Sequence, residues 1–143
     1  MNDLYLIVRI AGQTAAIAAP QVGSVIEVDA ITPVPRVVPH VAGLFALRSH
    51  VLTVIDAQAA LGRPPAARAG TLHAVIVTVD GHNYALLVEE VIDVVSTGVS
   101  TAAAAVLDGD WARVAIGQIM HGDDAVLLID AAVLIAGPEA LAA

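Results

Sequence analysis

VAGLFALRSHVLTVIDAQAALG, residues Val41–Gly62, is the stretch of sequence that decides the fold. It contains two apolar runs, Gly43–Leu47 and Val51–Ile55, and a short polar connection that begins with Arg48. Strand-forming residues on both sides of such a connection predict a β-hairpin, and hairpin connections lie at the surface. The guanidinium of Arg48 is permanently charged and carries five donors in a fixed fork, so its place on a rigid hairpin indicates a functional role.

The second apolar run ends in Asp56, and the residues AQAALG follow it. This alanine-rich stretch predicts one turn of helix, which Gly62 closes and the pair Pro64-Pro65 prevents from continuing. A carboxylate at the start of a helical turn typically accepts backbone N–H bonds, and we expect this role for Asp56 and Asp130. The unit is therefore a hairpin, an aspartate, a helical turn and a stop.

Apolar runs continue on both sides of this unit at the spacing of roughly 8 to 12 residues that is typical of all-β sandwiches and barrels. Turn signals separate most of the runs, and Asp80-Gly81 is the clearest hairpin signal. We expect strands at Leu4–Ile10, Thr14–Ile17, Ser24–Val28, Leu44–Leu47, Val51–Ile55, His73–Val79, Asn83–Val88, Ile92–Val95, Val114–Met120 and Ala125–Ile129.

Short helical turns are expected near Pro20–Gly23, near Ala57–Leu61 and at Ala131–Ile135. The proline-rich connection Gly62–Thr71 divides the predicted strands into two sets of about five. Residues 100–110 are alanine-rich and lack a clear pattern, so they predict a loop. The sequence therefore predicts an all-β fold with few helices, one of them at the C-terminus.

The composition predicts an aliphatic core. Hydrophobic residues make up 58% of the 143 residues, whereas aromatic residues make up 3%. Valine, isoleucine, leucine and alanine must therefore fill the interior, and β-branched residues suit strands. No uninterrupted apolar run reaches the roughly 20 residues that a membrane helix needs, and the N-terminus lacks the basic region of a signal peptide. We expect a cytoplasmic protein without direct membrane insertion.

The chain is strongly acidic. The formal net charge of -8 arises from 14 acids against six arginines and no lysine. An acidic surface opposes nucleic acid or an anionic membrane as a partner. Cysteine is absent, which excludes disulfides and a thiol nucleophile. With so few cations, each arginine is easier to interpret.

Catalytic and metal-binding patterns are missing from the sequence. The five histidines lack the i, i+4 spacing of a helical metal site, and no serine lies in a G-x-S-x-G motif. Glu89 and Glu90 are adjacent on a predicted strand, so their side chains point to opposite faces and cannot share a proton. Asp123 and Asp124 are too few ligands for a calcium cage. We therefore expect no enzymatic activity, no metal site and no cofactor.

The order of these motifs resembles the CheW-like domain, the coupling module of bacterial chemotaxis. The hairpin unit is similar to the family pattern of a glycine, an apolar pair, Asn-Leu-Arg-Gly, an apolar strand, Ile-Asp-Leu, a helical turn and Leu-Gly. Arg48 is kept, whereas Ala46 and Ser49 replace the usual asparagine and glycine, and Ser24 falls where a glutamate is frequent. Four further segments match in order: YLIVRIAGQTAAIAAPQVGSVIEV (Tyr5–Val28), AITPVPRVVPHVAGL (Ala30–Leu44), ALLVEEVIDVV (Ala85–Val95) and AVLLIDAAVLI (Ala125–Ile135).

The resemblance implies two small five-stranded SH3-like β-barrels that share a hydrophobic seam, within a single domain over residues 1–143. It implies a non-catalytic adaptor in bacterial chemotaxis signal transduction. Its partners would be the cytoplasmic tip of a methyl-accepting chemoreceptor and the regulatory domain of a CheA-type histidine kinase. Such an adaptor would be recruited to membrane-associated receptor arrays.

The resemblance also implies two binding surfaces. The receptor groove is expected between the barrels, with contributions from the segments Val22–Val28 and Val88–Val91. The kinase surface is expected at an aliphatic edge of the first barrel. The receptor-binding residues would be Arg48, Val22, Ser24 and Val88, and the kinase-binding residues would be Val41, Leu44 and Leu47.

Three alternatives stay open at this point. Arg48 could instead be a structural arginine that pairs internally with Asp56 or Glu27. Trp111, the single tryptophan, is expected in a half-buried core position, with a surface contact as the alternative. The whole chain could instead be a small-molecule-binding regulatory β-barrel outside chemotaxis, with its ligand in the seam between the barrels.

Overall fold

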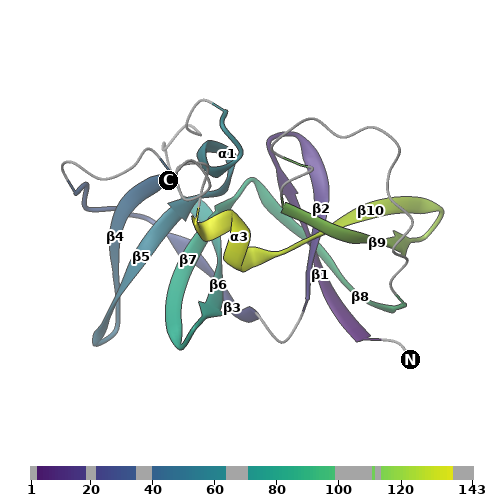
Figure 1. Ribbon diagram of the computed structural model, residues 1–143. Coiled ribbons are helices and arrows are strands. Elements are labelled where there is room, and N and C mark those ends of the chain that lie inside the picture. Colours follow the sequence, from purple (N-terminus) through teal and green to yellow (C-terminus); the bar gives the residue numbers. More distant parts are fainter. Residues whose placement is uncertain are drawn as a thin grey trace.

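In the part of the chain that the structure describes, ten strands form two five-stranded sheets, and short helices lie beside them (Figure 1). The structure is a computed structural model, and it describes residues 3–18, 22–34, 40–63, 71–98, 111 and 114–136. The terminal sheet has the order β8 (Glu90–Thr97), β1 (Asp3–Ile10), β2 (Gln13–Ala18), β10 (Asp124–Ile129) and β9 (Ala115–His121). The central sheet has the order β3 (Val22–Val28), β6 (Leu72–Val79), β7 (His82–Val88), β5 (His50–Asp56) and β4 (Val41–Leu47).

The predicted all-β fold is confirmed, and so are the helical turns α1 (Ala57–Ala60) and α3 (Ala131–Ala136). The helical turn predicted near Pro20–Gly23 is wrong at its second half, because β3 already begins at Val22. The first half of that turn and the loop predicted for residues 100–110 lie outside the described residues.

The prediction that Gly62–Thr71 separates two sets of strands is wrong. The central sheet contains β3 to β7 without a break, so strands before and after this connection pair with each other. The terminal sheet is built from both ends of the chain, because β8 returns to pair with β1 and β10 pairs with β2. Strand β4, where the kinase surface is expected, consequently belongs to the barrel from the middle of the chain rather than to a first barrel.

Three apolar clusters hold the sheets together, and the largest is the seam between them. Each barrel has its own interior, which for the central barrel includes Val54 and for the terminal barrel includes Ile7. The seam joins residues from both sheets and from α1 and α3, and Figure 1 shows α3 between the two barrels. Its fully buried members include Val8, Ile17, Ile55, Val75, Leu86, Ile129 and Leu134.

The seam explains why several strands are apolar on both faces. Along β1, Leu6 and Val8 lie in the seam, whereas Tyr5 and Ile7 lie in the interior of the terminal barrel. Successive side chains alternate between faces, so a strand buried on both sides reads as a continuous apolar run. Trp111 also lies in the seam and is 2% exposed, so it is fully buried rather than half-buried.

A backbone bridge closes the central barrel beyond its edge strand β4. The N–H of Thr32 donates to the carbonyl of Leu44 at 2.9 Å, and the N–H of Leu44 donates to the carbonyl of Thr32 at 2.9 Å. Gly43 makes this approach possible, because a Cβ at this position would lie 2.2 Å from the Thr32 oxygen. A glycine within a strand often marks such a close approach of two backbones.

A side-chain contact closes the terminal barrel between its two edge strands. His121 on β9 contacts Asp93 on β8, with 3.1 Å between Nε2 and Oδ2. The Val94 N–H donates to the other carboxylate oxygen of Asp93 at 2.8 Å. These two partners, the Val94 N–H first, hold the pKa of Asp93 below its ordinary value.

Asp93→Asn tests this closure through its pH dependence. A carboxyl whose pKa is lowered by folding stabilises the folded state above its unfolded pKa, and this contribution disappears as the pH falls through the folded pKa. The variant should therefore be less stable than the parent at pH 7, and the difference should vanish on acidification. Urea unfolding at a series of pH values from pH 7 to pH 2 measures this difference in stability. A difference that stays constant across the series would contradict the assignment.

Candidate functional site

Arg48 lies at the exposed tip of the β4–β5 hairpin, and its backbone has a positive φ of 56°. Its neighbour Ser49 does not share this conformation, so the two-residue turn has a positive φ at its first position only. The β9–β10 turn has the same pattern, but there the first position is Gly122, with a φ of 64°. This is the arrangement of a type II′ turn, in which glycine is preferred at the first position.

A positive φ is unfavourable for a bulky side chain, by about 1 kcal/mol relative to glycine. The glycine usual in the family pattern is replaced by Ser49, yet the strained conformation falls on Arg48. Nothing in the packing of the described residues requires arginine at this exposed position. A strained, exposed arginine is a recognised sign of a functional constraint.

The structure contradicts the internal ion pair considered for Arg48. Asp56 is 1% exposed at the far end of β5, where its Oδ1 accepts the N–H groups of Gln58 at 3.0 Å and Ala59 at 3.1 Å. It therefore caps α1, as expected from the sequence. Glu27 lies near the end of β3, which is also at the opposite end of the sheet. Within the described part of the chain, Arg48 forms no ion pair.

Three of the predicted receptor-binding residues lie at one end of the central sheet, and the fourth, Val88, does not. The strand pairings put the start of β3, with Val22 and Ser24, at the same end of the central sheet as Arg48. Within the sheet, β6, β7 and β5 lie between β3 and β4. Val88 lies at the other end of β7, is 8% exposed and packs in the seam. It supports the fold rather than presenting a surface.

Exposed apolar residues border the seam on both sheets. Val25 is 46% exposed and pairs with Val75, a buried seam residue, so both side chains lie on the same face. Val94 is 57% exposed and pairs with Leu6, another seam residue. Leu4, two positions before Leu6 on the same face, is 53% exposed. The seam therefore continues outward into apolar surface on edge strand β3 and on β1 and β8.

The predicted kinase-binding residues have different environments along β4. Val41 packs partly against the seam, and Leu47 packs partly against the interior of the central barrel. Leu44 points to the outer face, but its backbone already pairs with Thr32. The edge at Leu44 is therefore closed to a partner strand, and contact there would use side chains.

Comparison with known protein families matches residues 4–139 to the CheW-like domain. The chain belongs to the CheW-like domain family. Its fold is similar to the crystal structure of the scaffolding protein TtCheW from Thermoanaerobacter tengcongensis, with a TM-score of 0.74 and 18% sequence identity over 91% of this chain and 90% of that chain. No curated protein matches the chain. The predicted fold of two SH3-like barrels with a shared seam is thereby confirmed.

In this CheW-like chain, two adjacent carboxylates secure the crossing from the central to the terminal sheet. Glu89 lies between β7 and β8, and its N–H donates to the carbonyl of Arg9 at 2.8 Å. Its side-chain Oε1 accepts the N–H of Gly12 in the β1–β2 turn. Glu90 contacts the guanidinium of Arg9 at 2.6 Å. The two acids thus have separate partners. Glu89 itself lies outside the strands, so the prediction that both acids lie on one strand is wrong.

A cavity of about 330 Å³ lies between the crossing and α1. Its apolar lining comes from both sheets, with Ile10 of the terminal sheet and Leu87 of the central sheet. Sequence reasoning missed its polar lining, because the residues are far apart in the chain and only the sheet pairing brings them together. They are Asp56, Gln58, Thr71, His73 and Glu89.

Among the described residues, no group of three or more histidines and acids is arranged to hold a metal ion. None of the helices in the described ranges is long and apolar enough to cross a membrane.

Two substitutions at Arg48 separate its backbone from its side chain. Arg48→Gly and Arg48→Ala both remove the guanidinium, but glycine adopts a positive φ without a steric penalty. The glycine variant should therefore be more stable than the alanine variant by about 1 kcal/mol, as measured by urea unfolding. The matched pair Ser49→Gly and Ser49→Ala should show no such preference for glycine. Equal stabilities for the two Arg48 variants would contradict the strained turn.

Proposed function

We propose that this chain is a non-catalytic adaptor that couples chemoreceptors to a CheA-type histidine kinase. Membership of the CheW-like family supports a role as a chemotaxis scaffold. The observation that carries the proposal is Arg48, an exposed arginine at a strained hairpin tip without an ion pair among the described residues. Arginine recognises carboxylates through two parallel bonds and is enriched at binding hot spots.

The receptor would bind at the central barrel and along the exposed apolar residues beside the seam, Val25, Leu4 and Val94. Arg48 supplies the polar anchor, and Val22 and Ser24 lie at the same end of the sheet. Val25 and Val94 offer apolar area where the seam reaches the surface. A receptor segment with a carboxylate and an apolar face fits this combination, since hot-spot charges are surrounded by apolar contacts. Val88 would contribute indirectly, because its buried side chain packs in the seam between the two sheets.

The kinase regulatory domain would bind separately, at the outer side of β4 around Leu44. This strand is an edge of the central sheet, with its backbone partly covered by Thr32. Separate surfaces let one adaptor hold both partners at once, and linked contacts then act at high effective concentration. The adaptor would change kinase output by holding the kinase beside the receptor, and it would transfer no phosphoryl group. We propose that residues 1–143 act together as one such unit.

Arg48→Glu tests the receptor contact. Reversal of the charge should leave the circular dichroism spectrum intact and weaken binding of a receptor-tip fragment by on the order of tenfold, because a hot-spot arginine is lost and carboxylates are repelled. Biolayer interferometry with the immobilised fragment measures the affinity.

Two controls accompany this measurement. Gln13→Glu adds a negative charge to an exposed position on the other barrel and should leave receptor binding unchanged. Binding of the kinase regulatory domain should also persist in Arg48→Glu. If the receptor-tip affinity of Arg48→Glu equals that of the parent, Arg48 is not the anchor.

The cavity of about 330 Å³ between the crossing at Glu89 and α1 favours a second candidate function, a small-molecule-binding regulatory protein outside chemotaxis. The cavity combines an apolar lining from both sheets with polar groups from three segments. A ligand bound only to the folded state raises the melting temperature by mass action. A thermal-shift screen of small metabolites distinguishes the two functions, because an adaptor responds to its protein partners instead.

A further inference from the structure

Four segments of the chain meet around the cavity between the crossing at Glu89 and α1, which we call the junction cavity. Strand β5 runs parallel to β7 and ends beside it, with Asp56 opposite Leu87. Strand β6 begins on the other side of β7. The crossing brings in the end of β1, because the Glu89 N–H donates to the carbonyl of Arg9 at 2.8 Å. The junction cavity is therefore formed by both sheets.

The size and the apolar wall of the junction cavity suit a small molecule. Its volume of about 330 Å³ lies within the range of roughly 300 to 1,000 Å³ that small-molecule sites occupy. The apolar wall includes Ile10, Leu87 and Val88, which are all 8% exposed or less. A compact apolar body would fill the space against these side chains and gain dispersion contacts with them. Because Ile10 belongs to the terminal sheet and Leu87 to the central sheet, such a ligand would contact both sheets.

Two carboxylates give the junction cavity a negative charge. Asp56 and Glu89 both line it, and the described part of its lining contains no arginine. Backbone donors hold both groups in place, because Asp56 Oδ1 accepts the N–H groups that begin α1 and Glu89 Oε1 accepts the N–H of Gly12. Arg9, at the end of β1, contacts Glu90 instead, at 2.6 Å. The described lining therefore offers two anionic acceptors and no fixed cation.

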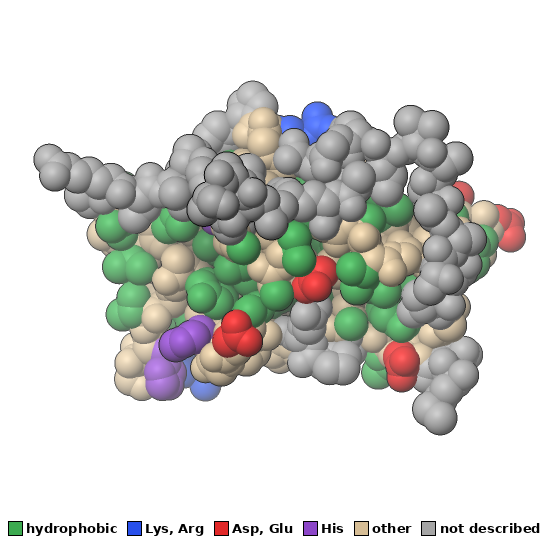
Figure 2. All heavy atoms as spheres, in the orientation of Figure 1, with side chains coloured by type: hydrophobic (Ala, Val, Ile, Leu, Met, Phe, Trp, Pro, Cys, Tyr) green, Lys and Arg blue, Asp and Glu red, His purple; other side chains and the backbone are tan. Residues whose placement is uncertain are grey.

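The other polar groups of the lining, and the protein surface as a whole, also favour a cation. Gln58 and Thr71 each carry an oxygen that accepts a hydrogen bond, and His73 adds a ring nitrogen. Acidic side chains are spread over both barrels on the face in Figure 2, and the chain carries a net charge of -8. Such a surface attracts small cations and repels small anions.

We propose that the junction cavity binds a small molecule that carries a primary ammonium group on a compact apolar body. An ammonium group has N–H donors and no acceptor, so it matches a site in which both charged groups are acceptors. Its hydrogen bonds to Asp56 and Glu89 are charge-assisted, and such bonds are stronger than neutral ones. The proposal rests on the second candidate function, because it names the class of ligand that this cavity takes.

Phenethylamine and phenethyl alcohol are the probes for this site. They share one carbon skeleton, and at pH 7 the amine is protonated whereas the alcohol is neutral. Titration of the ¹⁵N-labelled full chain with each compound gives the affinity, and the amide shifts locate the site. Phenethylamine should shift amides around the cavity, including those of Ala11, Gln58 and Glu89. Phenethyl alcohol should bind more weakly by on the order of tenfold, because it lacks the charge-assisted hydrogen bonds.

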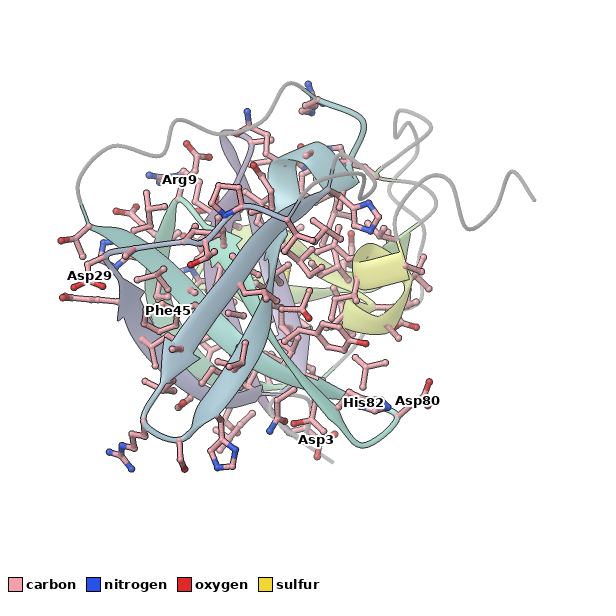
Figure 3. All side chains as sticks on the ribbon, turned by 90° about the vertical axis from the view of Figure 1, so that its left-hand side faces the viewer. Asp3, Arg9, Asp29, Phe45, Asp80 and His82 are labelled. Carbon is pink, nitrogen blue, oxygen red and sulfur yellow. The ribbon has the colours of Figure 1, made fainter. Side chains whose placement is uncertain are left out.

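Two variants with the same change of charge separate the cavity from the rest of the protein. Glu89→Gln removes one charge from the lining and keeps an oxygen that can accept the Gly12 N–H, so the preference for the amine should fall by on the order of fivefold. Asp80→Asn removes a charge at the β6–β7 turn and should keep the preference of the parent. Figure 3 shows Asp80 and His82 at the opposite end of the molecule from Arg9.

Four results would overturn the proposal. They are equal affinities for the two probes, no binding of phenethylamine at millimolar concentration, amide shifts centred outside the cavity, and an unchanged preference for the amine in Glu89→Gln.

The ligand class and the proposed functions are contradicted by different results. If both probes bind in the cavity with equal affinity, the cavity is a ligand site and the ammonium class falls. If neither probe binds and the thermal-shift screen finds no ligand, the second candidate function falls as well. If phenethylamine binds as predicted while Arg48→Glu leaves receptor-tip binding unchanged, the ligand site stands and Arg48 falls as the receptor anchor.

Discussion

The burial of the two sheets against each other in the seam is the constraint on which the rest of the structure depends. Leu86 of the central sheet and Val8 of the terminal sheet are 0% exposed in this one cluster. Neither sheet could expose its seam face to water without a large loss of hydrophobic free energy, since each fully buried aliphatic side chain contributes about 1.5 to 3 kcal/mol. The seam also includes both described helices, so the short α1 and α3 owe their order to it.

The seam stabilises the two sheets, and the proposed binding residues lie on the surface of these sheets. The crossing at Glu89 ties the central sheet to the β1–β2 turn, and the Thr32–Leu44 bridge closes the central barrel. The β4–β5 hairpin projects from this closed barrel. The pairing of β4 with β5 holds Arg48 in its strained backbone conformation. A binding residue on a rigid element loses little conformational entropy when a partner arrives.

Strands and caps could be predicted from the sequence because they depend on local patterns. The apolar runs located the strands, and Asp56 and Asp130 accept helix N–H groups as their positions suggested. Strand pairing could not be predicted, because an apolar run buried on both faces carries no sign of which sheet it joins. The division at Gly62–Thr71 was wrong for this reason, and the place of Val88 in the seam was hidden as well.

The candidate site, too, could be predicted from the sequence only where it depends on local patterns. Arg48 stood out in the sequence as a lone charge between apolar runs, and the structure places it at an exposed turn. The positive φ at Arg48, rather than at Ser49, follows from turn geometry that residue types alone did not reveal. His50 and His82 are far apart in sequence and line one cavity only through the parallel pairing of β5 with β7.

Native-state hydrogen exchange on Leu86→Ala tests most directly whether the seam joins the barrels into one cooperative unit. The variant opens a cavity in the seam and should lower the free energy of opening by about 3 kcal/mol. If the seam joins the barrels, the decrease should be equal at the slowest-exchanging amides of β1 in the terminal sheet and β6 in the central sheet. A decrease confined to β6, with β1 unchanged, would contradict it.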